Sequence, residues 1–137
     1  MWIVVLACWP WLLFGRSKST ASVWDGVYSD AQALRGETAY RTNCGSCHGP
    51  KLAGHGQNPS LAGSNFLSKW NGQTVGDLFE KIQISMPADR PGKLSAAENS
   101  AIVAYILKFN GFPVGSKDLA ESADELRDIR FEAEKPH

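Results

Sequence analysis

Five consecutive residues, Cys44-Gly45-Ser46-Cys47-His48, constrain the fold of this chain more than any other feature. Two residues between the cysteines allow both sulfurs to reach the two vinyl-derived carbons on one edge of a haem. The adjacent histidine then lies under the iron and can donate an imidazole nitrogen to it. The motif therefore predicts one covalently bound haem c with its iron, held by Cys44, Cys47 and His48.

Three other interpretations of the motif stay open at this point. A zinc site needs about four ligands, but the remaining candidates, Cys8, His55 and His137, form no second pair. A thioredoxin-like redox pair belongs at a strand-to-helix junction, whereas this motif follows a predicted helix. A plain disulfide between the two cysteines would leave the Gly- and Pro-rich loop at residues 44–65 with nothing to enclose.

The hydrophobic pattern predicts helices and no convincing strand. Apolar residues recur three and four positions apart in four segments. These segments are residues 30–43, residues 75–84, the stretch from Ser95 to Asn110 and, more weakly, residues 118–133. Cap residues precede the three stronger segments, namely Ser29 or Asp30, Thr74, and Ser95 with Glu98. The predicted class is therefore all-α, with helices separated by two long loops.

The iron needs a sixth ligand from elsewhere in the chain, and imidazole with a thioether suits an electron-transfer haem. Apart from the initiator, the only methionine is Met86, which lies between two predicted helices. In mid-helix it would be interpreted as core packing, but here Pro87 fixes the backbone and aims the side chain. The rival ligand is His55, which follows His48 by only seven residues in a Gly-rich segment. From there the opposite haem face is hard to reach, so the residues favour Met86.

The first part of the chain is predicted to lie outside the fold. Trp2 to Gly15 carry no charge, and this run is shorter than the roughly 20 residues of a membrane-spanning helix. Its length matches the apolar core of a signal peptide. We expect residues 1–21 to be a cleaved export signal, with an uncleaved anchor, a lipoprotein-type Cys8 or a buried strand as alternatives. The protein is then periplasmic or exported, and it contacts a membrane only if this segment is retained.

The charge balance excludes one class of partner. The chain has 14 Lys and Arg against 14 Asp and Glu, and loss of Arg16 and Lys18 with the export segment would leave a net charge of −2. A nucleic-acid-binding domain normally carries a basic surplus. No nucleic-acid partner is therefore expected.

Taken together, the pattern resembles class I cytochrome c. The resemblance rests on Cys44–His48, on Met86-Pro87 between two predicted helices, and on Asn110-Gly111-Phe112-Pro113 after the second. The segment from Met86 to Pro113 is similar to cytochrome c domains that accompany quinoprotein alcohol dehydrogenases. The resemblance covers residues 30–134 and implies helices wrapped around one covalently bound haem. The implied organisation is an export signal or N-terminal anchor at 1–21, a linker at 22–29, a haem domain at 30–113 and a C-terminal helical extension at 114–137.

The resemblance also implies roles for single residues. Pro59 matches a proline whose carbonyl points at the histidine below the iron and strengthens it as a ligand. Trp70 matches an indole that donates a hydrogen bond to a haem propionate. Gly36, Tyr40 and Tyr105 match the contact at which the first helix crosses the helix after the methionine loop.

These properties imply an electron carrier and not an enzyme. With His48 and Met86 both bound to iron, no position remains for a substrate. The expected partners are redox proteins, such as a quinoprotein dehydrogenase or a terminal oxidase, bound through a small polar interface. Two alternatives stay open: an electron-transfer subunit fixed to a quinoprotein dehydrogenase complex, and a haem-based gas sensor or peroxidase, which requires an iron position that opens.

Overall fold

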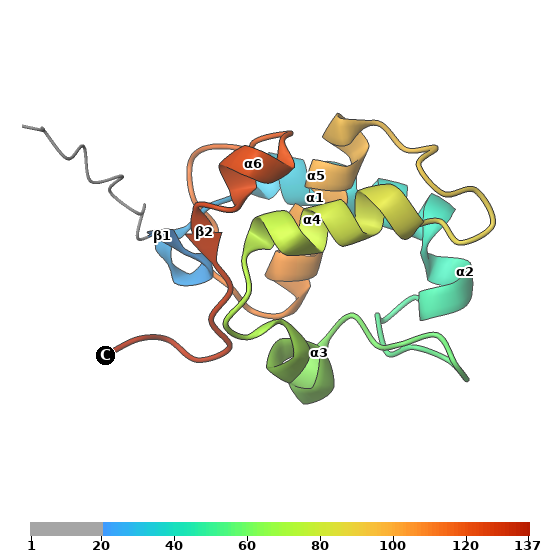
Figure 1. Ribbon diagram of the computed structural model, residues 1–137, viewed down its shortest axis with the longest axis horizontal. Coiled ribbons are helices and arrows are strands. Elements are labelled where there is room, and N and C mark those ends of the chain that lie inside the picture. The colour runs from blue at the N-terminus through green and yellow to red at the C-terminus, as the bar shows by residue number, and fades with distance from the viewer. Residues whose placement is uncertain (1–20) are drawn as a thin grey trace, which may run out of the picture.

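The structure, a computed structural model, describes residues 21–137 and is mostly helical (Figure 1). Its elements in chain order are β1 (Ala21–Ser22), the 3-10 helix η1 (Val23–Asp25), α1 (Asp30–Asn43), α2 (Gly45–His48), α3 (Gly63–Trp70), α4 (Val75–Ser85), α5 (Ala96–Phe109), α6 (Ala123–Leu126) and β2 (Ile129–Arg130). In Figure 1, α2 lies at one end of the molecule, and the β1–β2 pair lies at the other. The helical architecture is that of a cytochrome c fold, as predicted. The expected export segment at residues 1–21 lies, except for Ala21, outside the described residues.

Side-chain caps begin the three longest helices, as the sequence predicts. Ser29 Oγ accepts a hydrogen bond from Gln32 N at 3.1 Å, which starts α1. Thr74 with Asp77 and Ser95 with Glu98 form capping boxes at the starts of α4 and α5. Each cap satisfies backbone N–H groups that have no partner within the helix.

The crossing of α1 and α5 forms the centre of the domain. A Cβ atom at Gly36 would lie 1.7 Å from the carbonyl oxygen of Ala101, so only glycine permits this approach. The rings of Tyr40 and Tyr105 pack beside it with their centroids 5.4 Å apart. The predicted contact of the two helices is therefore present. Phe109, the last residue of α5, is 43% exposed.

The segment at residues 22–29, expected to be a linker, is packed into the domain. Val23 and Tyr28 are buried, and Tyr28 donates a hydrogen bond to the carbonyl oxygen of Phe112 at 2.5 Å. The strands β1 and β2 pair in parallel, so the start and the end of the described chain are joined.

The predicted helix at residues 118–133 is wrong for most of its length, since only α6 forms there. Phe131 explains the difference, because its N–H donates to Gln73 O at 2.8 Å and its carbonyl accepts from Gly72 N at 2.9 Å. These bonds to another segment hold the chain extended. The Phe131 ring packs edge-on against Phe66 and Phe112, with centroids 5.9 and 5.5 Å away.

Helix α3 was not predicted, and its N-terminus shows why. No side chain of its own segment caps it. Instead, Asn110 at the end of α5 accepts a hydrogen bond from Gly63 N at 3.0 Å and donates one to Leu61 O at 3.0 Å. Within residues 21–137, none of the helices combines the length and the apolar composition needed to cross a bilayer.

Candidate functional site

The two cysteines of the motif lie on a tight turn at the end of α1. Cys44 N donates to Tyr40 O at 2.8 Å and ends the helix, and His48 N then donates to Cys44 O at 2.9 Å. The short helix α2 thus brings Cys44, Cys47 and His48 onto one turn. Both thiols are free, with Cys47 exposed and Cys44 partly buried. Burial, followed by the neighbouring Cys47, raises the pKa of the Cys44 thiol to about 11.

A single hydrogen bond orients the imidazole of His48. Its Nδ1 lies 2.8 Å from the carbonyl oxygen of Pro59, and the side chain is only 8% exposed. A carbonyl can only accept, so Nδ1 carries the proton and Nε2 keeps a lone pair. This is the arrangement in which a histidine binds a metal, with a second residue fixing the tautomer and the ring. The contact expected for Pro59 from the resemblance is therefore present.

The loop between α2 and α3 encloses this histidine. Gly54 N donates to His48 O at 2.8 Å, and Leu61 N donates to the carbonyl of the buried Leu52 at 2.8 Å. His55 and Asn58 exchange backbone hydrogen bonds of 3.1 and 3.0 Å in a turn just before the Pro59 that contacts His48. The exposed His55 is therefore held in the loop that packs on His48, which is consistent with its rejection as the opposite ligand.

The candidate sixth ligand follows α4 directly. Met86 N donates to Ile82 O at 2.9 Å, and the backbone then turns extended. The side chain is partly buried and packs against the hydrophobic core. Figure 1 shows the loop after α4 at the same end of the molecule as α2. Met86 thus begins the loop that runs to this end of the molecule, and its role as an iron ligand stays a prediction.

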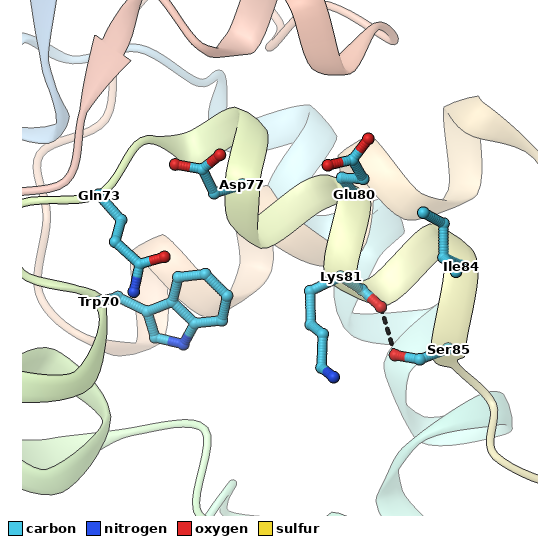
Figure 2. Close-up of a pocket in the computed structure, with 7 residues that line it drawn as sticks. All are labelled: Trp70, Gln73, Asp77, Glu80, Lys81, Ile84 and Ser85. Atoms are coloured by element: carbon cyan, nitrogen blue, oxygen red, sulfur yellow. Dashed lines mark hydrogen bonds between the residues drawn. The ribbon is translucent and has the colours of Figure 1, made fainter.

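A pocket of about 370 Å³ lies along α4, the helix that leads to Met86. It is lined by Trp70, Gln73, Asp77, Glu80, Lys81, Ile84 and Ser85 (Figure 2). Trp70 was expected at the cofactor from the resemblance, whereas Lys81 and Ile84 were not singled out. Ile84 is 66% exposed. Its position two residues before Met86 is the feature of the sequence that could have pointed to it. His48 and Met86 do not line this pocket.

The residues present fit a covalently attached haem. Two free thiols are separated by two residues, and the imidazole beside them has its Nδ1 held by Pro59, which leaves Nε2 for a metal. An apolar side chain, Ile84, is left exposed two residues before Met86. Within residues 21–137, no three His, Cys, Asp or Glu side chains gather as a metal cluster.

Comparison with known proteins identifies the family of this chain. Residues 31–106 match the protein family described as cytochrome c oxidase, cbb3-type, subunit III. The chain is similar in fold to the crystal structure of the sulfane dehydrogenase SoxCD from Paracoccus pantotrophus, with a TM-score of 0.52 and 22% identity over 93% of this chain and 68% of that one. No curated protein matches the sequence. Since the family match includes the haem motif and more than half of the sequence, the chain belongs to this cytochrome c family, and its chemistry is haem-based electron transfer.

Proposed function

We propose that the protein is a monohaem cytochrome that carries single electrons, with haem c joined to Cys44 and Cys47 and the iron held between His48 and Met86. When bound, the haem supplies the one-electron chemistry of iron. The observation that carries the proposal is the hydrogen bond of 2.8 Å between His48 Nδ1 and Pro59 O. It leaves Nε2 with its lone pair, able to bind the iron, and it holds the imidazole in one orientation.

Both proposed ligands are fixed by the helices and side chains next to them. His48 ends α2 and is fixed by Pro59, while Met86 directly follows α4 and packs on the core. Ligands that keep their positions in both oxidation states keep the reorganisation energy of electron transfer small. With His48 and Met86 both holding the haem iron, no position would remain there for a substrate, so the protein would transfer electrons only. A thioether ligand would favour the ferrous state and raise the potential.

Redox proteins are the proposed partners. The family description names a terminal oxidase, and the fold is shared with a dehydrogenase complex. We place the protein in the periplasm or outside the cell, with membrane contact only if residues 1–21 are retained. A fixed subunit of a quinoprotein dehydrogenase is the alternative, and copurification at constant stoichiometry separates it from a free carrier.

The ligand assignment is tested by absorption spectra of the oxidised and reduced holoprotein. Ferric haem with a sulfur ligand has a characteristic far-red band. Met86→Ala is expected to abolish this band and to lower the reduction potential, because the soft ligand is lost. His55→Ala is the matched control and is expected to leave both unchanged.

Three outcomes oppose the proposal. A far-red band that survives in Met86→Ala, or that disappears in His55→Ala, refutes the assignment of Met86. A wild-type protein without haem in its spectrum or mass, after export in a host that attaches haem, refutes the function itself. Carbon monoxide binding to the native reduced protein at neutral pH would indicate an open iron position and favour a gas sensor or peroxidase.

A further inference from the structure

Tyr40 on α1 is bonded to both ends of the haem motif. Its backbone carbonyl accepts a hydrogen bond from Cys44 N at 2.8 Å, and its hydroxyl donates one to the carbonyl oxygen of Gly49 at 2.7 Å. Cys44 is the first residue of the motif, and Gly49 directly follows His48. The side chain of Tyr40 is fully buried, so water does not compete for its hydroxyl. A single residue therefore closes the turn that carries Cys44, Cys47 and His48.

The crossing of α1 and α5 holds this hydroxyl in place. The Tyr40 ring packs on Tyr105 with the centroids 5.4 Å apart. One turn earlier on α1, the close approach of Gly36 to Ala101 leaves no space between the helices. Burial raises the pKa of Tyr40, so the hydroxyl keeps its proton and stays a donor at neutral pH. The donor is therefore positioned by helix packing and not by the motif that it contacts.

The carbonyl of Gly49 is also the start of the loop that encloses His48. It accepts a second hydrogen bond, from Leu52 N at 3.2 Å. The same loop continues to Pro59, whose carbonyl oxygen lies 2.8 Å from His48 Nδ1. The place of Pro59 thus depends on where the loop starts, and Tyr40 fixes that start.

We propose that Tyr40 is a positioning residue for the iron ligand, because its hydroxyl holds the loop so that Pro59 keeps its hydrogen bond to His48. The inference rests on the proposed function, in which Nε2 of His48 binds the haem iron. A histidine whose other ring nitrogen donates a firm hydrogen bond is a more basic ligand. A more basic ligand favours the ferric state, so a loosened bond to Pro59 raises the reduction potential. Tyr40 acts through the loop and not by contact with the iron.

The test removes the hydroxyl alone, in the reduced holoprotein. Proton NMR after transfer into D₂O measures how fast the Nδ1 proton of His48 exchanges, at one pH and temperature. Tyr40→Phe is expected to speed this exchange about fivefold, the factor expected for one lost neutral hydrogen bond. It is also expected to shift the reduction potential upward. The ring itself is kept, so its contact with Tyr105 remains.

Two matched variants separate positioning from stability. Tyr105→Phe removes a hydroxyl from the other ring of the same pair, and within residues 21–137 that hydroxyl makes no hydrogen bond, so both readouts should equal those of wild type. Tyr28→Phe removes a hydroxyl that donates to Phe112 O from a buried ring, outside the loop that encloses His48. It should lower the free energy of unfolding about as much as Tyr40→Phe does, and should leave the exchange rate and the potential unchanged.

The outcomes distinguish this role from the proposed function. If the His48 proton exchanges no faster in Tyr40→Phe than in Tyr105→Phe, or if the potential does not rise, the role of Tyr40 is refuted while a normal haem spectrum leaves the function intact. If Tyr28→Phe speeds the exchange equally, Tyr40 acts through general stability and the role is again refuted. Loss of the far-red band in Tyr40→Phe would also refute it, because the potential would then have changed through Met86. If wild type carries no haem, the proposed function fails and takes this inference with it.

Discussion

Replacing Gly36 by alanine tests the packing of the two helices that frame the haem motif. The added Cβ would lie 1.7 Å from Ala101 O, 2.4 Å from Ala101 C and 3.0 Å from Tyr105 Cβ. Two of these atoms belong to the backbone of α5, so no side chain can rotate away. The helices must separate by about 1.3 Å to restore a contact of 3.0 Å.

The expected cost follows from two opposing effects. Overpacking of this kind costs about 3 kcal/mol or somewhat more when backbone must shift. Alanine is a better helix former than glycine by about 1 kcal/mol, which offsets part of the cost. The net expectation is a loss of about 2 kcal/mol in the free energy of unfolding, which for a domain of this size lowers Tm by about 8 °C.

Urea unfolding of the holoprotein, followed by far-UV circular dichroism, measures this loss. Gly45→Ala is the matched control, because a Cβ on that helical glycine meets only Tyr40, at an ordinary 3.7 Å. It should be neutral or slightly stabilising. If Gly36→Ala is as stable as Gly45→Ala, with an unchanged denaturant slope, the close crossing of α1 and α5 is refuted.

Two further predictions concern polar groups. Asn99 is fully buried, and neither its Nδ2 nor its Oδ1 has a hydrogen-bond partner among the described residues. Asn99→Leu should therefore raise the free energy of unfolding by about 1 kcal/mol, measured by urea unfolding. A loss of stability would show that the amide is hydrogen-bonded. The hydrogen bond from Ser29 and the ion pair with Arg35 hold the pKa of Asp118 below its usual 3.8. Its stabilisation is therefore present above pH 3.8 and lost as pH falls through the lowered pKa. Asp118→Asn should cost less than about 1 kcal/mol at pH 7, because the pair is exposed. Thermal melts of the two proteins should converge as the pH falls below the lowered pKa of Asp118, and a gap in Tm that does not narrow with falling pH would refute the ionic origin.

Much of the site could be read from local sequence. The motif at residues 44–48 could be recognised because its residues are close together in the chain, at a spacing that lets two thiols and an imidazole reach one cofactor. Met86 could be proposed as a ligand because it is the one methionine besides the initiator. The exposed Ile84 was not singled out, since an isoleucine is not informative until its surroundings are known.

Whether a helix could be predicted from the sequence also depended on how close its cap lies in the chain. Those whose caps lie within four residues were predicted, as for α4 with Thr74 and Asp77. The helix α3 was not, because Asn110 caps it from the end of α5. The weak periodicity before Phe131 was misleading, because hydrogen bonds to Gly72 and Gln73 hold that residue in an extended conformation.

The amino-acid sequence by itself determined the helical class, the caps, the covalent haem motif and the likeness to cytochrome c, since each depends on residues close together in the chain. Tertiary structure alone decided that Asn110 caps α3, that β1 pairs with β2, and that Trp70 and Lys81 line one pocket. The physical reason is distance along the chain. Interactions between remote segments depend on how every intervening helix packs, and no local pattern records that packing.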